Sequence, residues 1–175
     1  PLHLNSMYLS VRELPNGHGE LVSPHDNLSP FNPIFQLTGQ PTFPDAYTNI
    51  SRFPMTAVAS LAFSGGGIIT NVRDMSEWGN ALFGGRATSA STIQTMLQSI
   101  PATPDDGGDY LGYGIWTNNR VSEKDYFVGH NGRAPGYRSV MMYQPDRKMT
   151  IAILANYYGC DPYLIAKKLY EELPN

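Results

Sequence analysis

The residues best suited to chemistry lie in one short segment, 129–137, which reads Gly-His-Asn-Gly-Arg-Ala-Pro-Gly-Tyr. The segment contains two turn signals, Asn131-Gly132 and Pro135-Gly136, whereas a hairpin needs only one. If Pro135-Gly136 forms the turn, His130 lies at the end of a strand, where its titratable imidazole projects to one face and Gly132 lets a ligand approach the backbone. If Asn131-Gly132 forms the turn, His130 is an ordinary polar residue beside it. The pattern alone leaves both interpretations open.

The other reactive side chains show no arrangement typical of a site. His18 and the pair His25-Asp26 lack the regular spacing of metal ligands, so we expect no metal. The single cysteine, Cys160, lies just before a predicted helix and is interpreted as a small buried residue rather than a nucleophile. The run Ser64-Gly65-Gly66-Gly67 is not followed by the Lys-Ser/Thr of a phosphate-binding loop, so it is interpreted as a flexible connector. We expect no cofactor.

The segment around His130 belongs to a series of predicted strands. Short runs rich in aromatic and β-branched residues, separated by turn signals, predict strands at 111–117, 124–129, 137–144 and 148–157, with a shorter one within 2–11. Proline at the second position of 144–147 predicts a turn, so the last two strands should form an antiparallel hairpin. The almost wholly apolar run Met149–Ala155 predicts a strand buried on both faces in the middle of a sheet.

Two amphipathic helices are predicted between residues 71 and 100. Asn71 is a suitable N-cap with Asp74 three residues later, and the apolar spacing continues until Gly84-Gly85. A second helix is expected to begin at Ser91, with Gln94 as its capping partner, and to end at Pro101.

A third helix is predicted at 161–173. Asp161 would cap this helix and Pro162 would occupy its first turn. The apolar residues at helical spacing, expected to be buried, are Ile165, Leu169 and Leu173.

Residues 14–57 form a long loop region. Seven of the 14 prolines lie within it, interleaved with aromatic residues. A connection of this length is uncommon in a compact domain unless it is functional. We expect an ordered excursion that packs on the domain and lines a pocket.

Composition and length favour one domain, residues 1–175, of the α+β class, in which a mainly antiparallel sheet packs with helices. The 12 basic residues are scattered and the formal net charge is −3, so no nucleic-acid partner is expected. The longest apolar stretches, 57–63 and 149–155, are far shorter than the roughly 18 residues of a membrane span, and none is expected.

Five segments together resemble a known family. In chain order they are 64–75, 113–116, 129–132, 135–139 and 152–156. They look like the C-terminal half of the serine β-lactamase-related enzymes, a family that holds class C β-lactamases, D,D-carboxypeptidases and related esterases. The likeness extends from residue 64 to the end and, more weakly, over the first residues. It implies the C-terminal part of a β-lactamase and D,D-peptidase-like (transpeptidase-like) fold.

The resemblance implies a role for each residue from 130 to 133. His130 would occupy the family's third active-site motif and supply a hydrogen bond or a positive charge near the nucleophile and the substrate carboxylate. Asn131 stands where a hydroxyl residue is usual and would donate to a substrate carboxylate or amide. Gly132 would keep the strand edge open, and the backbone N–H of Arg133 would form one half of the oxyanion hole.

Two further family motifs are missing. The family nucleophile is the serine of a Ser-x-x-Lys sequence, and no serine here has lysine three residues later; Ser64 and Ser76 are followed by glycine at that position. Tyr47-Thr48-Asn49 has the letters of the second motif, Tyr-x-Asn, but lies too close to the glycine run. We therefore expect the C-terminal part of a larger penicillin-recognising acyl-serine hydrolase, inactive by itself.

Alternatives remain. The chain could be a noncatalytic binding module with the same fold, or a hydrolase that uses a residue of its own such as Ser64 or Cys160. The full-length form would act on a small molecule or a peptidoglycan peptide, and the resemblance alone suggests a periplasmic or extracellular location.

Because the family pairs the last strand with one from the missing half, we expect an exposed edge at 148–157 and a homo-oligomer formed through it.

Overall fold

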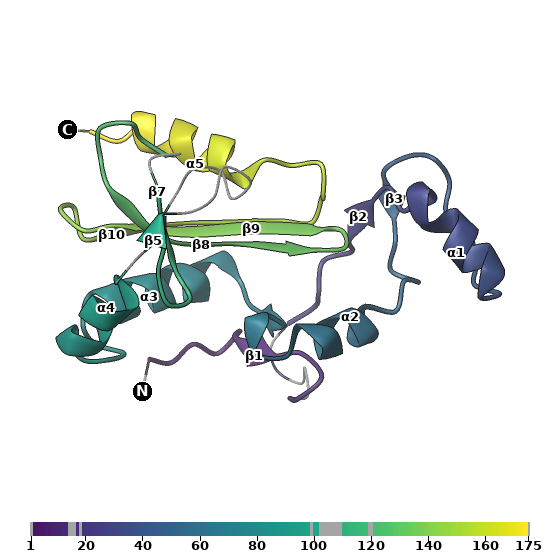
Figure 1. Cartoon of the computed structure of the whole chain (residues 1–175), viewed down its shortest axis with the longest axis horizontal. Coiled ribbons are helices and arrows are strands. Elements are labelled where there is room, and N and C mark those ends of the chain that lie inside the picture. Colours follow the sequence, from purple (N-terminus) through teal and green to yellow (C-terminus); the bar gives the residue numbers. More distant parts are fainter. Residues whose placement is uncertain are drawn as a thin grey trace.

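A six-stranded antiparallel sheet lies at the centre of the part of the chain that the structure describes (Figure 1). The structure is a computed structural model and describes residues 2–13, 17, 19–98, 100–101, 110–118 and 121–174. The strands lie in the order β10-β9-β8-β7-β6-β5, and each neighbouring pair is antiparallel. They are β5 Ile100–Pro101, β6 Tyr110–Leu111, β7 Trp116–Asn118, β8 Phe127–Ala134, β9 Tyr137–Gln144 and β10 Met149–Ala155. The predicted fold class is confirmed.

Helices cover the sheet on both faces (Figure 1). Helix α3, Val72–Phe83, packs on β9 and β10 from one side, and α5, Pro162–Glu171, packs on the same two strands from the other. As predicted, the Asn71 side chain caps α3 by accepting the Asp74 N–H at 2.8 Å, and the helix ends just before Gly84. Asp161 likewise caps α5, accepting the Tyr163 N–H at 3.0 Å.

Helix α4, Ala90–Met96, differs from its prediction at both ends. Its cap is Ser89, whose hydroxyl accepts the Thr92 N–H at 3.1 Å, so the helix begins before Ser91 and Gln94 is not its capping partner. The backbone leaves the helix after Met96, well before Pro101, and enters β5.

Two apolar clusters hold the layers together. On the α5 face, Phe127 of β8 packs edge-on against Tyr170, with ring centroids 5.0 Å apart. On the opposite face, Tyr143 of β9 stacks on Phe83 of α3 at 5.2 Å, beside Met96 at the end of α4. Both faces of the middle strands are thereby buried.

The burial predicted for β10 and α5 is wrong. β10 is an edge strand, and only Ile151 of its seven residues is buried, because no described strand lies on its outer side. The buried face of α5 consists of Pro162, Tyr163, Ala166 and Tyr170, whereas the residues expected there are exposed: Ile165, Leu169 and Leu173. Helix and strand together leave an open groove of about 360 Å³, lined by Val72, Ser76, residues 149–152, Leu169 and Leu173.

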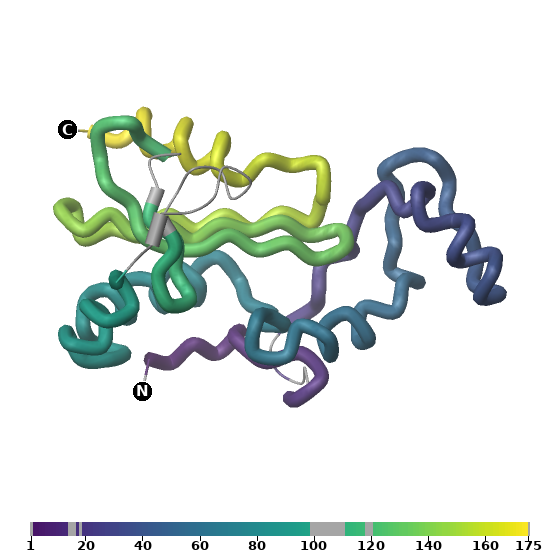
Figure 2. Tube along the Cα trace, viewed as in Figure 1, coloured from purple at the N-terminus to yellow at the C-terminus, as the bar shows by residue number. Residues whose placement is uncertain are grey.

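The N-terminal part of the chain runs below the sheet (Figure 2). Of the strand predicted within 2–11, only β1, Tyr8–Leu9, forms, and it pairs with β4, Ile68–Ile69. In the sequence, α2, Met55–Ala62, and the short helix η2, Phe63–Gly65, come just before β4. The glycine run is thus part helix and part entry to a strand.

The described part of the region 14–57 is ordered and has its own small core. It contains β2 His25–Asp26, η1 Ser29–Phe31, α1 Asn32–Leu37 and β3 Thr48–Asn49. Leu28, Phe43 and Ile50 are buried together, with Phe35 and Phe53 against them. The region extends beyond the end of the sheet (Figure 1). It lines neither the groove beside β10 nor a second cavity, which lies between α2 and the residues after β1.

Candidate functional site

The four predicted site residues His130, Asn131, Gly132 and Arg133 are consecutive in β8. Pro135-Gly136 forms the turn into β9, with Gly136 at φ 74°, a left-handed conformation that glycine adopts without a steric penalty. Of the two interpretations left open by the sequence, the one with a turn at Asn131-Gly132 is therefore wrong. The strand continues beyond the predicted end at Gly129 and carries the whole motif.

One backbone edge of this segment is open. β7 pairs with β8 only over Phe127–Gly129, so no described strand lies beside the residues that follow. The two-residue turn makes Ala134 and Tyr137 a hydrogen-bonded pair, and the pairs alternate along an antiparallel ladder. The N–H and C=O groups of Asn131 and Arg133 therefore point away from β9, toward the open edge. Such groups can bind an anionic oxygen or an extended ligand.

His130 lies at the start of this open edge and is exposed. The Trp116 indole N–H donates to its Nε2 at 2.8 Å, and its Nδ1 lies 2.5 Å from the backbone oxygen of Asn131. The two rings meet edge to face, with centroids 5.9 Å apart and planes at 86°. Sequence reasoning did not assign Trp116 to the site. Its signals are its position in the predicted strand ahead of the His130 strand and its place in segment 113–116, one of the five that resemble the family.

Gly132 makes a close contact across the ladder. A Cβ at this position would lie 2.3 Å from the Ser139 hydroxyl oxygen on β9. A larger residue here would force the Ser139 hydroxyl to rotate away. The expected role of Gly132, keeping the edge open for a ligand, stays a prediction, as does ligand donation by the half-buried Asn131.

Two arginines and one buried aspartate, Asp26, lie near the hairpin end. Arg133 and Arg138 are direct cross-strand partners, and Arg133 is exposed. The Arg138 guanidinium lies over the Tyr158 ring at 5.3 Å, and its Nε is buried without a hydrogen-bond partner among the described residues. The exposed Arg133 guanidinium, on the strand with the open edge, favours a ligand with negative charge.

The tip of the hairpin is anchored by β2 and by the segment just before it. Asp26 is 6% exposed, and its Oδ2 accepts the buried Gly136 N–H at 2.9 Å. The Tyr137 hydroxyl donates to the Val22 carbonyl at 2.5 Å, and burial raises the pKa of that phenol, with a further contribution from nearby Tyr8. No sequence pattern pointed to Asp26 in this role, because its partner is a backbone amide 110 residues away.

The other candidate residues are not assembled into this site. Asn49, from the Tyr-x-Asn lookalike, uses its Oδ1 to accept the Ser51 N–H at 2.8 Å and thus stabilises a turn. Within the described ranges, neither the Ser64 hydroxyl nor the Cys160 thiol has a titratable hydrogen-bond partner that could activate it. Among the same residues no cluster of His, Cys, Asp and Glu could hold a metal, and no helix is long and apolar enough to span a membrane.

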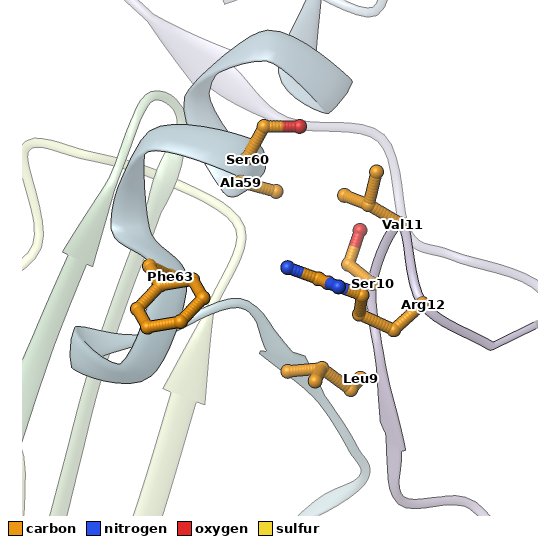
Figure 3. Close-up of a pocket in the computed structure, with 7 residues that line it drawn as sticks. All are labelled: Leu9, Ser10, Val11, Arg12, Ala59, Ser60 and Phe63. Carbon is orange, nitrogen blue, oxygen red and sulfur yellow. The ribbon is translucent and has the colours of Figure 1, made fainter.

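A cavity of about 240 Å³ lies elsewhere, between the end of α2 and the segment after β1 (Figure 3). It is lined by Leu9, Ser10, Val11, Arg12, Ala59, Ser60 and Phe63. The Arg12 guanidinium lies 5.8 Å from the centre of the Phe63 ring. None of the four residues of β8 lines this cavity, so it is separate from the candidate site.

Comparison with known proteins identifies the family. The sequence profile described as beta-lactamase matches residues 26–171, which is most of the chain. No curated protein is similar enough to count as a match.

Several solved structures share the fold at low sequence identity. D-amino acid amidase from Ochrobactrum anthropi SV3 superposes with a TM-score of 0.71 at 18% identity, covering 98% of this chain and 49% of that one. An octameric penicillin-binding protein homologue from Pyrococcus abyssi gives 0.70 at 20% identity, with coverages of 97% and 34%. A D-stereospecific amidohydrolase from Streptomyces sp. gives 0.63 at 20%, with coverages of 90% and 41%.

The chain thus spans less than half the length of each of these structures. The likeness confirms the fold, and the profile match over 26–171 agrees with the motifs read from the sequence. The chain belongs to the beta-lactamase family.

Proposed function

We propose that this chain forms the His130-bearing wall of an active site that hydrolyses amides or esters through an acyl-serine intermediate. The observation that carries the proposal is the open edge of β8, where an outward-facing backbone N–H at Arg133 lies three residues from an exposed imidazole. In such a reaction the serine oxygen bonds to the carbonyl carbon, and the carbonyl oxygen becomes an anion. The leaving group departs with a proton, and water later releases the acid.

Each residue of the open edge has a part in this proposal. The N–H of Arg133 donates to the developing oxyanion, and a second donor comes from the nucleophile's own backbone. His130 exchanges a hydrogen bond with the reacting groups, and Asn131 donates to the substrate. The exposed Arg133 guanidinium favours substrates that carry a carboxylate, such as a penicillin or a peptidoglycan peptide.

The nucleophile is proposed to come from polypeptide outside these 175 residues. None of their serines has lysine three residues later, and neither Ser64 nor Cys160 has an activating base within the described residues. The lack of an activated nucleophile among these residues also favours a second candidate function, a binding module that keeps the fold and holds the ligand without covalent chemistry.

Assembly through β10 is a further part of the proposal. This strand has an unpaired edge in the described structure, Leu154 is 40% exposed, and the groove beside it is lined by apolar residues of α3 and α5. An apolar strand edge pairs readily with another copy. One structural neighbour is an octamer by its own description, which is compatible with assembly in this family.

The first test is intact-mass spectrometry before and after incubation with a penicillin. The chain itself should remain at 19.3 kDa without an adduct. A longer gene product that adds a Ser-x-x-Lys segment should gain one penicillin. An adduct on the short chain that maps to Ser64 or Cys160 would overturn the proposal, and binding without an adduct in both forms would identify a binding module.

A pair of variants at Arg133 tests the oxyanion role in the acylating form. Arg133→Ala keeps the backbone N–H and removes only the guanidinium, so it is the reference against which the next variant is measured. Arg133→Pro removes that N–H, and because the group points away from β9, the ladder keeps its hydrogen bonds. Relative to Arg133→Ala, the expected loss in Arg133→Pro is ~10²–10³ in acylation rate. Equal rates for the two variants would show that Arg133 contributes no oxyanion donor.

A further inference from the structure

The hydrogen bonds of the His130 ring define its protonation state. An indole N–H can only donate, so Nε2, which lies 2.8 Å from the Trp116 nitrogen, must present its lone pair. A backbone carbonyl can only accept, so Nδ1, which lies 2.5 Å from the Asn131 oxygen, must carry a proton. Of the three states of an imidazole, only the neutral Nδ1–H tautomer satisfies both contacts.

The strand register explains how Trp116 reaches this ring. Trp116 is the first residue of β7 and lies opposite Gly129, the residue before His130. A Cβ at Gly129 would lie 1.8 Å from the Met141 carbonyl oxygen, so a larger residue is excluded there. With no side chain opposite it, the indole extends past Gly129 to the neighbouring histidine at the end of the β7 pairing.

The acidic residues do not provide another partner for the imidazole. Within the described ranges no Asp or Glu lies within ion-pair distance of His130, and the one ion pair found there joins Arg86 and Glu77. An imidazolium would set an Nε2–H against the indole N–H, so that two donors would face each other and the contact would be lost. The Trp116 contact therefore favours the neutral ring.

We propose that Trp116 is a positioning residue that holds His130 as the neutral Nδ1–H tautomer, with Nε2 directed to receive a hydrogen-bond donor. The inference rests on the proposed function and refines it. A hydroxyl or amide N–H can replace the indole at Nε2, whereas a carboxylate cannot, because it has no proton to donate when ionised. His130 is then the partner of the nucleophile's hydroxyl or the substrate's N–H, and the substrate carboxylate is bound elsewhere on the edge.

The test is NMR of the ¹⁵N-labelled chain, which needs no hydrolysis. Long-range ¹H–¹⁵N spectra distinguish a protonated ring nitrogen from a bare one. In the native chain at neutral pH, Nε2 of His130 should be bare and Nδ1 protonated. In Trp116→Phe, which keeps an aromatic ring and loses the N–H, water replaces the indole and a measurable share of the Nε2–H tautomer should appear.

The indole itself gives a second, independent reading. The chain has two tryptophans, so an amide correlation spectrum contains two indole signals, and that of Trp78 in α3 serves as an internal control of folding. The Trp116 signal should move in His130→Leu, which removes the acceptor, and recover part of its position in His130→Gln, whose side-chain oxygen can accept. The Trp78 signal should stay in place in both.

Two results would overturn the inference. One is an Nε2–H tautomer in the native chain. The other is an unchanged Nε2 signal in Trp116→Phe, which would assign the tautomer to the Asn131 carbonyl alone. Failure of penicillin acylation affects neither spectrum, so failure of the proposed function and failure of this inference can be told apart.

Discussion

The bond between Asp26 and Gly136 should control how firmly the end of the β8–β9 hairpin is held. The carboxylate oxygen accepts a buried amide N–H at 2.9 Å across 110 residues of sequence. A hydrogen bond to a charged group contributes about 2 kcal/mol, and an unpaired buried N–H costs a similar amount. Asp26→Ala should therefore raise the opening equilibrium at the hairpin tip by roughly 30-fold, since about 1.4 kcal/mol corresponds to a factor of ten.

Hydrogen exchange at the Gly136 amide measures this opening directly. Its exchange rate in Asp26→Ala should rise by roughly 30-fold over the native chain, while amides in the middle of β9 change little. Asp45→Asn is the matched control, because Asp45 lies in the same excursion but bonds to Asn27 and Ser29 rather than to the hairpin. Unchanged exchange at Gly136 in a folded Asp26→Ala chain would refute the reasoning.

Three further predictions concern other parts of the molecule. Tyr170→Phe should lower the free energy of unfolding by about 1 kcal/mol at pH 7, because the hydroxyl loses its 3.0 Å bond to the Asp125 carboxylate. Burial, and after it the bond to Asp125, raises the pKa of Tyr170 above 10.0, so the hydroxyl stabilises the fold fully below pH 10.0 and stops doing so as the pH rises through the higher pKa of the folded state. Urea unfolding should therefore show the difference in unfolding free energy between native chain and variant narrowing as the pH rises through that pKa, and a constant difference contradicts this. Hydrogen bonds from Asn27, and after it from Ser29, hold the pKa of Asp45 below 3.8, so the contribution of Asp45 to stability is present above pH 3.8 and lost as the pH falls through the lower pKa of the folded state. Asn27→Ala should raise the pKa of Asp45 in a carboxyl NMR titration, and an unchanged pKa would be evidence against the bond. Leu154→Lys should weaken self-association in light scattering at tens of micromolar, and a native chain that is already monomeric there would count against assembly through β10.

Local signals in the sequence predicted the elements that depend on local chemistry. Asn71 with Asp74 determines where α3 begins, and a proline-glycine pair determines the turn between β8 and β9. These features depend on side chains that bond within three residues of themselves or on backbone conformations that few residues adopt. The antiparallel pairing of β9 with β10 followed from the same kind of signal, the proline turn at 144–147.

Features that depend on distant partners were not predictable in this way. Helix α5 has two apolar stripes, and only its packing on the sheet decides that the one with Tyr163 and Tyr170 is buried while the one with Leu169 is exposed. The apolar run of β10 has the composition of an interior strand, yet no described strand lies on its outer side. Both wrong predictions concern residues that line the groove beside β10. This groove has the apolar composition of a protein interior, but no described element covers it.

For the candidate site, the sequence predicted the strand that carries it and missed what orients it. Resemblance to the family selected His130, and the register of β8 confirmed that its neighbours lie on one strand. The roles of Trp116 and Asp26 were not predicted because each acts on a residue outside its own sequence neighbourhood. Such contacts depend on the register of paired strands and on how distant segments of the chain meet, which a single sequence does not reveal.

The position at which β7 begins determines how much of the edge of β8 stays uncovered for a ligand. β7 begins at Trp116, after a tight turn in which the Gly112 N–H donates to the Ile115 carbonyl at 2.8 Å. From there to the end of β8 five residues remain, about 17 Å of uncovered strand at ~3.4 Å per residue. Moving this turn by two residues would cover or uncover about 7 Å of that edge. The turn at 112–115 therefore sets the length of the uncovered edge while every residue of the candidate site stays the same.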